Sequence, residues 1–135
     1  MQILPTAPEA STVKGPADWF TGDVWFDVVA APPAPSRLRV NTVHFAPGAL
    51  TFWHRHAHGQ TLHITEGVAR VGTRDGQVVE IRPGQTLWTP PGEWHWHGAT
   101  PGTFMTHLAM WEAGDEADGP DTDWAEEVTA EQYGR

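Results

Sequence analysis

Short runs rich in β-branched and aromatic residues, separated by glycine- and proline-containing turns, dominate this sequence of 135 residues. With Gly 14 and Pro 12, the chain suits many short strands rather than a helical bundle. Asp75-Gly76 is a hairpin signal, because this dipeptide tolerates positive φ angles. Strands are predicted at 24–29, 37–45, 51–56, 61–65, 69–73, 78–81, 85–89, 94–98 and 103–111. This spacing predicts an all-β barrel or sandwich.

The length and a hydrophobic content of 39% predict one domain with its own core. We expect an irregular N-terminal segment (1–14), the barrel (15–112) and an acidic C-terminal tail (113–135). In the tail, Asp123 and Glu126 have capping-box spacing, which predicts a short helix from Trp124 to about Gln132. Trp124 and Tyr133 favour a tail that docks on the barrel over a mobile end.

The formal net charge of -9 is unevenly distributed. No Lys or Arg occurs between Arg82 and Arg135, so the barrel is nearly neutral and the acidity is peripheral. The tail carries Glu112, Asp115, Glu116, Asp118, Asp121, Asp123, Glu126, Glu127 and Glu131, which we expect to form a solvated surface. No basic stripe is present to neutralise phosphates, which argues against nucleic acid as a partner.

Cysteine usage and the first residues bear on the compartment. Cys 0 excludes disulfides, thiolate metal ligands and cysteine nucleophiles. The N-terminal residues lack a basic region followed by a long apolar run, so no signal peptide and no membrane span are predicted. We expect a cytoplasmic protein.

Histidine spacing points to a metal site. His54 and His56 lie two residues apart in a predicted strand, so their imidazoles share one face. Gln60 follows four residues later, and His95 lies on a separate segment. Three imidazoles and one neutral amide suit a borderline divalent metal and leave coordination positions open for a substrate. The alternatives are that the histidines are unrelated, or that water replaces Gln60 as a ligand.

The four candidate ligands lie within two glycine-containing motifs. The first frame is Gly48-x5-His54-x-His56-x3-Gln60-x6-Gly67, and the second is Gly84-x5-Pro90-x-Gly92-x2-His95. These frames resemble the paired motifs of the cupin family, whose members have a small antiparallel β-barrel, or jelly roll, with a metal inside. The family's usual first motif ends its ligand set with Glu, where this chain has Gln60. Its usual second motif ends in Asn, where this chain has Ala99.

The Gln60 departure is informative. Together with the segments 15–22, 91–99 and 106–109, it makes the chain similar to small single-domain bacterial cupins that include manganese-dependent hydroxynitrile lyases. The resemblance runs from about Lys14 to Tyr133. It implies a cupin jelly-roll barrel and a metal held by His54, His56, Gln60 and His95. Manganese is the expected metal, with Fe, Zn, Ni and Co as alternatives.

Strand alternation sorts the other histidines. If His95 points inward, so does His97, whereas Trp96 faces away. His107 shares a face with Ala109 and Trp111. The subfamily resemblance places His97 and His107 in the pocket, where we expect one to act as a catalytic acid or base. The alternative is that each is a hydrogen-bonded core histidine. The remaining histidines, His44, His58 and His63, are expected at the surface or an interface.

The predicted pocket mixes polar and apolar groups. Asn41, Val43 and Phe45 share one face of an early strand and, with Thr51, are expected to line the cavity. Hydroxynitrile-lyase-like members tend to carry a polar residue at the position of Trp111. Trp111 should therefore narrow the cavity, because an indole fills space that a smaller polar side chain would leave open. The other tryptophans are expected mostly in the core.

The expected site favours chemistry at a carbonyl or hydroxyl group. A divalent metal without an anionic ligand keeps its full charge and is a strong Lewis acid. With a nearby imidazole, it suits reversible cleavage of a cyanohydrin to a carbonyl compound and cyanide. Oxidative cleavage or isomerisation with iron, and non-catalytic binding of a metal or small ligand, are the alternatives. We expect a small-molecule substrate and a homodimer or homotetramer.

Overall fold

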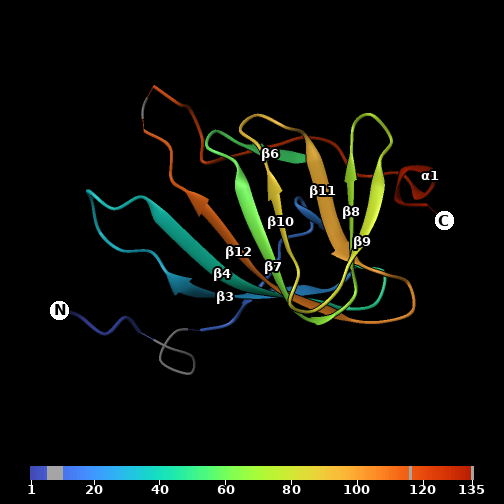
Figure 1. Ribbon diagram of the computed structural model, residues 1–135, viewed down its shortest axis with the longest axis horizontal. Coiled ribbons are helices and arrows are strands. Elements are labelled where there is room, and N and C mark those ends of the chain that lie inside the picture. Colours follow the sequence, from blue (N-terminus) through green and yellow to red (C-terminus); the bar gives the residue numbers. More distant parts are fainter. Residues whose placement is uncertain (6–10, 116, 135) are drawn as a thin grey trace.

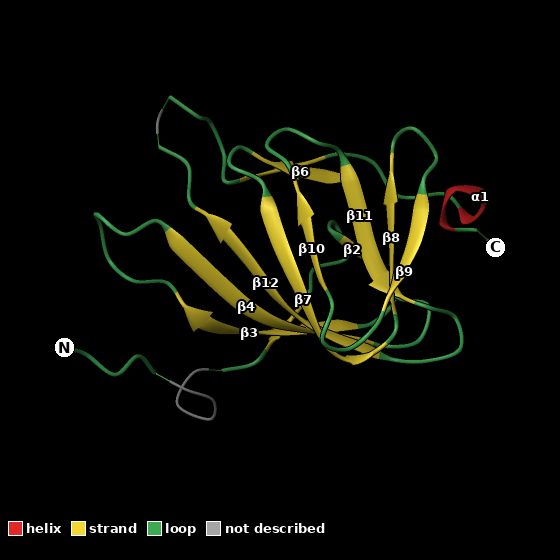
Figure 2. Ribbon diagram, viewed as in Figure 1, coloured by secondary structure: helices red, strands yellow, loops and turns green. Residues whose placement is uncertain are grey.

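Two antiparallel β-sheets curl around a shared core and form a half-barrel (Figure 1). The computed structural model describes residues 1–5, 11–115 and 117–134. Figure 2 shows strands joined by loops, and a short helix on the outside, near the C-terminus. This all-β fold confirms the fold class predicted from turn spacing and from the two motif frames.

The strands are β1 (Val13–Lys14), β2 (Phe20–Thr21), β3 (Val24–Ala30), β4 (Leu38–Phe45), β5 (Leu50–Thr51), β6 (His54–His56), β7 (Gln60–Gly67), β8 (Ala69–Thr73), β9 (Val78–Ile81), β10 (Thr86–Thr89), β11 (His95–Ala99), β12 (Met105–Glu112) and β13 (Thr122–Trp124), and the helix is α1 (Ala130–Tyr133). One sheet has the order β1-β3-β4-β12-β7-β10. The other has the order β13-β6-β11-β5-β2, with β8 paired to both β11 and β9. Long-range pairing therefore brings the tail strand β13 beside β6, which carries His54 and His56.

The expected strand 51–56 is divided. Phe52 and Trp53 leave the ladder between β5 and β6, because their N–H groups donate to Trp19 O (2.7 Å) and Glu126 O (3.0 Å). The two residues thus bond to segments near opposite ends of the chain. The break ties the residues just before His54 to both of these segments.

The barrel interior is filled mainly by aliphatic side chains. Its core comprises Val24, Val43, Phe45, Ala49, Leu62, Ile64, Ala69, Val71, Ile81, Ala99, Met105 and Ala109. Along β7, Gln60, Leu62 and Ile64 are buried and His63 is only half-buried, as the alternation predicts. Gln60, at the start of β7, therefore points into the barrel on the same face as Leu62 and Ile64.

A second core lies outside the barrel, under the tail. Trp53, Trp96, Val128 and Tyr133 form it together with Leu50. Trp96 faces away from the barrel interior, yet it is 1% exposed because the tail covers it. Gly72 pairs with Trp96, and a Cβ there would lie 2.4 Å from the indole, so only glycine admits the ring.

Fewer tryptophans are fully buried than expected, although Trp94 and Trp111 pack against the two cores. Trp53 and Trp96 are buried, whereas Trp19, Trp25 and Trp88 are exposed. Trp94, Trp111 and Trp124 are half-buried. The reason is that aliphatic side chains already fill the barrel interior, and several indoles instead border the cavity described below.

The two ends of the chain also differ from expectation. The N-terminal segment is not wholly irregular, since β1 pairs with β3, while residues 6–10 lie outside the described ranges. The C-terminal helix is shorter than predicted and begins later, at Ala130. Thr129 and Gln132 form its capping box, because Asp123 is held in strand β13 and cannot act as an N-cap. The tail is docked, as predicted, through β13, Val128 and Tyr133.

Candidate metal centre and cavity

Strand pairing gathers the predicted ligands at one end of the barrel. His54 and His95 are the first residues of β6 and β11, and they are direct partners across that pair. His56 lies two residues along β6, and Gln60 begins β7. All four side chains are at most 5% exposed. The structure thus brings together the four residues that the two sequence motifs singled out.

Backbone carbonyls fix the orientation of three imidazole rings. His54 Nδ1–H donates to Phe52 O (3.0 Å), and His95 Nδ1–H donates to Glu93 O (3.0 Å). His56 Nδ1–H donates to Asp121 O (3.2 Å) in the tail. A ring held in this tautomer presents the lone pair of Nε2, which is the usual arrangement of a histidine that binds a metal.

The imidazoles are neutral near pH 7. Burial lowers the pKa of His56 and of His95 to about 4. Burial, followed by the neighbouring His95 and His56, lowers the pKa of His54 well below its usual range. The cluster therefore excludes protons, which compete with a metal for the same lone pairs.

The polar atoms that meet at this point fit a bound cation. With its proton directed to Glu93, His95 presents Nε2 to Gln60 Oε1 at 3.0 Å, so two acceptors face each other. Nε2 of His56 is buried and makes no hydrogen bond. Buried acceptors without donors are costly unless a cation satisfies them.

A second histidine pair adjoins the first cluster. His97 Nδ1 lies 3.0 Å from His107 Nε2, and the outer nitrogens, His97 Nε2 and His107 Nδ1, are buried without a partner. Burial lowers the pKa of His107 to about 4 and that of His97 well below its usual range. Both rings are therefore neutral near pH 7 and can exchange a proton at a buried site.

His97 also lies close to the first cluster. Ring nitrogens of His54, His95 and His97 all lie within 4.8 Å of one another, so these three buried histidines could hold a divalent metal. His97 differs from His54, His56 and His95 in one respect. Its Nδ1 faces another imidazole, whereas theirs donate to backbone carbonyls.

A cavity of about 380 Å³ opens onto this cluster. Of the predicted pocket residues, Asn41, Val43, Thr51 and Trp111 line it. Phe45 does not line the cavity and belongs instead to the barrel core. The centroid of its ring lies 5.9 Å from that of His97 and 5.3 Å from that of His107.

The two inner histidines have different relations to the cavity. His97 lines it together with His54, His56 and Gln60. His107 is fully buried, does not line it, and contacts the ring of His97. Trp111 narrows the cavity, with its ring 5.9 Å from that of His56. Its Nε1–H is buried without a partner, so the indole also retains a donor.

Sequence reasoning missed much of the aromatic lining of the cavity. Trp19, Phe20, Phe26, Ala109, Asp121, Thr122 and Trp124 also line it. The rings of Trp19 and Trp124 stack, with centroids 5.1 Å apart and an interplanar angle of 4°. These two residues come from opposite ends of the chain, so no local pattern indicates that they meet. The one available signal was a pair of tryptophans in segments otherwise poor in apolar residues.

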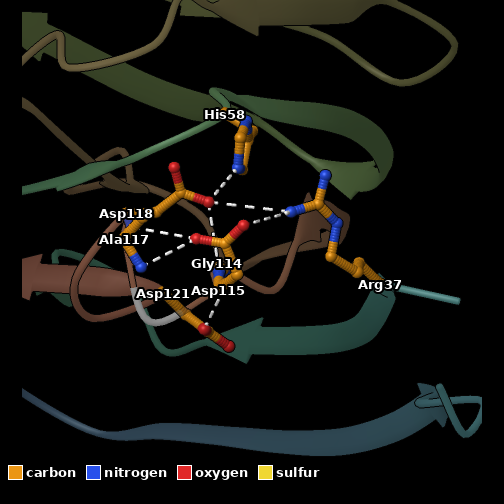
Figure 3. A network of polar contacts seen from close by, with 7 residues as sticks. All are labelled: Arg37, His58, Gly114, Asp115, Ala117, Asp118 and Asp121. Atoms are coloured by element: carbon orange, nitrogen blue, oxygen red, sulfur yellow. Dashed lines mark hydrogen bonds and ion pairs between the residues drawn. The ribbon is translucent and has the colours of Figure 1, made fainter. Parts of the chain in front are cut away.

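The acidic tail was expected to be a solvated surface, but several of its carboxylates pair with side chains of the barrel. Figure 3 shows Asp118 between His58 and Arg37. Its Oδ2 atom lies 2.8 Å from His58 Nε2 and 3.6 Å from Arg37 Nη1. The backbone N–H of Asp115 and the imidazole of His58 lower the pKa of Asp118. Further along, Asp123 pairs with Arg55 (2.9 Å) on β6. Glu116 lies outside the described residues.

The other histidines lie away from the cluster. His44 contacts Thr106 (3.2 Å) and Asp27 (3.4 Å), and His63 contacts Thr86 (2.9 Å). Both are half-buried, as is His58. Within the described ranges, no helix has the length and apolar character needed to cross a bilayer.

Fold and site together define a class of protein. Its members are curled antiparallel barrels with buried histidines that can hold a divalent metal inside one end. The chain belongs to the cupin family, since residues 41–110 match the Cupin domain. That stretch includes both histidine motifs and the whole of β4 except its first residues.

Known relatives are consistent with this assignment. A protein of Granulicella tundricola named (R)-mandelonitrile lyase is 49% identical over 135 residues, covering 100% of both chains. The crystal structure of a cupin-like protein from Thermotoga maritima matches with a TM-score of 0.81 and 34% identity over 89% of each chain. A polyketide cyclase from Streptomyces resistomycificus shares the fold alone, at 18% identity and a TM-score of 0.73, over 98% of this chain and 91% of its own.

Proposed function

We propose that this protein is a metal-dependent hydroxynitrile lyase, which cleaves cyanohydrins reversibly to a carbonyl compound and hydrogen cyanide. One observation carries the proposal. Three neutral imidazoles oriented by carbonyls, one amide and an additional neutral histidine meet at an aromatic-lined cavity. The full-length identity of 49% to a protein named (R)-mandelonitrile lyase supports it.

We assign His54, His56, His95 and Gln60 as the metal ligands. In each of the three histidines, Nδ1–H donates to a backbone carbonyl, which leaves Nε2 available for the metal. His97 differs, because its Nδ1 faces His107. Manganese is the metal we propose, by similarity to the subfamily. When bound, a divalent ion supplies a Lewis acid that polarises a carbonyl or hydroxyl oxygen.

His97 is the proposed base. It lines the cavity and is neutral near pH 7, and its Nε2 has no hydrogen-bond partner. In the cleavage direction, Nε2 accepts the proton of the cyanohydrin hydroxyl. The C–O bond gains double-bond character while the carbon–nitrile bond breaks, and the electron pair leaves with cyanide. Cyanide then takes the proton from His97, which restores the neutral imidazole and releases hydrogen cyanide.

His107 is proposed to position His97. At 3.0 Å, its Nε2 can accept the proton on His97 Nδ1, which fixes the tautomer whose Nε2 is free to act as base. The same contact would stabilise the imidazolium formed during cleavage. His107 itself is not proposed to touch the substrate, since it does not line the cavity.

The cavity suits an apolar substrate with one polar end. Trp19, Phe20, Phe26 and Trp111 supply flat apolar walls, and Asn41 supplies an amide. Such a site orients an aromatic or alkyl group away from the histidines and excludes water from the reacting carbon.

The proposal is tested with protein stripped of metal and reloaded with Mn²⁺. Benzaldehyde release from mandelonitrile is followed by absorbance, with parallel measurement of oxygen uptake. We expect release that depends on metal and consumes no oxygen. His97→Ala should keep the metal and lose activity by about a hundredfold or more, the usual size of an acid–base contribution.

His63→Ala is the matched control, since His63 faces away from the barrel interior and bonds Thr86. It should retain the parent rate. Failure of the loaded protein to cleave any of several alkyl and aromatic cyanohydrins would refute the lyase assignment. Oxygen uptake with an enol or diketone would instead favour oxidative cleavage.

A further inference from the structure

The C-terminal tail lies directly against the proposed metal ligands. We propose that Trp124 is a positioning residue for His54, and that tail residues 121–124, which lie against β6, are required for tight metal binding. This inference rests on the metal site assigned above. It gives the docked part of the acidic tail a role in building the site.

Strand pairing places the tail beside the ligands. In the pair β13–β6, Trp124 is the direct partner of His54 and Thr122 is the partner of His56. β13 is the edge strand of its sheet, so β6 has the tail as its neighbour on one side and β11 on the other. Removing the tail would therefore leave β6 exposed along one edge.

Trp124 covers the ring of His54. Their ring centroids lie 4.7 Å apart with an interplanar angle of 32°. The opposite neighbour of Trp124 is Trp19, stacked at 5.1 Å, and Phe20 lies edge-on at 6.0 Å. These contacts hold the indole firmly, so it limits the rotation of the His54 ring and keeps water from it.

The tail also orients His56. Its Nδ1–H donates to the backbone carbonyl of Asp121, and Thr122 Oγ1 lies 3.3 Å from the same nitrogen. His54 and His95 instead use carbonyls within two residues of themselves. Among the three proposed histidine ligands, His56 thus depends on a partner 65 residues away in the chain.

Several contacts fasten the tail to the barrel. Arg55 pairs with Asp123 (2.9 Å) and Arg74 pairs with Glu126 (2.5 Å). Tyr133 is 1% exposed, and its hydroxyl donates to Ala99 O (2.6 Å). The ion pairs are partly exposed and individually weak, so the buried aromatic contacts fix the tail more firmly.

The consequence concerns metal affinity. Groups that orient metal ligands commonly contribute tenfold to hundredfold in affinity, because a free ring must lose its rotation when it binds. Trp124 acts on His54 through contact with its ring, and Asp121 acts on His56 through its carbonyl. Residues 121–124 should therefore lower the dissociation constant for metal more than they affect folding of the barrel.

The decisive experiment compares Mn²⁺ dissociation constants of the full-length parent, Trp124→Ala, Trp124→Phe and Val128→Ala by competition with a chelating dye. Circular dichroism of the metal-free proteins establishes that each is folded. We expect Trp124→Ala to weaken binding by about tenfold to hundredfold. Trp124→Phe should recover most of the affinity, because a phenyl ring still covers His54.

Val128→Ala is the matched control. Val128 is buried under the tail in the second core, where it packs with tryptophans and Tyr133 rather than in the histidine cluster. It should lower the melting temperature and leave the metal affinity within about twofold, whereas a merely structural role for Trp124 would give both variants the same pattern. Imidazole ¹⁵N shifts of the metal-free proteins add a direct readout. His54 should show one tautomer in the parent and averaged shifts in Trp124→Ala.

The outcomes separate the two proposals. A parent that binds no metal refutes the metal site and this inference together. A parent that binds while a folded Trp124→Ala binds equally well refutes the role of Trp124 alone. If Trp124→Ala is unfolded, Trp124→Leu decides, since it keeps bulk without a ring face. Parent-like affinity in that variant would also overturn the inference.

Discussion

Acidification should unfold the metal-free protein well above the pH at which exposed carboxylates titrate. His56, His95 and His107 have a pKa of about 4 in the native state, against 6.5 in an unfolded chain. Between these values the unfolded chain binds protons that the native protein excludes. Stability is therefore lost as the pH falls from 6.5 toward 4, and it changes little above 6.5 on this account.

The magnitude follows from the three values. Lowering the pH from 6.5 to 5 should cost on the order of 1–2 kcal/mol per histidine, or about 5 kcal/mol for three. The pKa of His54 and of His97 is lowered well below its usual range, so both histidines add to this loss in the same direction. The loss from the first three histidines alone is comparable with the entire free energy of unfolding of a marginally stable domain, about 5 kcal/mol.

Urea titrations of the metal-free protein at pH 7, 6, 5.5 and 5 measure this dependence. The urea midpoint should fall at each step below pH 6.5. Mn²⁺ should shift the loss to lower pH, because a bound cation occupies lone pairs that would otherwise take protons. His107→Gln should reduce the slope near pH 5 by about 1 kcal/mol per pH unit, nearly one proton's share. A free energy of unfolding that stays constant from pH 6.5 to 5 would refute the reasoning.

Three further predictions concern the proposed site. His54→Ala combined with His95→Ala should abolish metal binding and remove the rise in melting temperature that metal produces; full occupancy, measured by elemental analysis, would contradict the ligand assignment. Gln60→Glu should still bind Mn²⁺, with equal or higher affinity, but should slow cyanohydrin cleavage, because a carboxylate partly neutralises the ion; an unchanged kcat would mean that the neutral amide is incidental. Trp111→Gln should enlarge the cavity and raise the rate with mandelonitrile at some loss of thermal stability; rates compared at equal metal occupancy decide this.

Much of the architecture could be predicted from local pattern. Runs at 69–73 and 78–81 coincide with β8 and β9, because the Asp75-Gly76 turn fixes both ends of that hairpin. Alternation correctly assigned the inward residues of β7 and the outward orientation of Trp96. Period-2 alternation is a property of the strand itself, so it survives whatever the strand later packs against.

The sequence by itself determined the strand framework and the two motifs that bring His54, His56, Gln60 and His95 to one end of the barrel, since backbone geometry dictates which face each residue takes. Tertiary structure alone decided what covers those faces. Trp96 is buried and Trp124 reaches His54 only because the tail returns across the sheet to pair with β6. Contacts between residues that are 65 or more positions apart depend on the path of the whole chain, and no local pattern encodes that path.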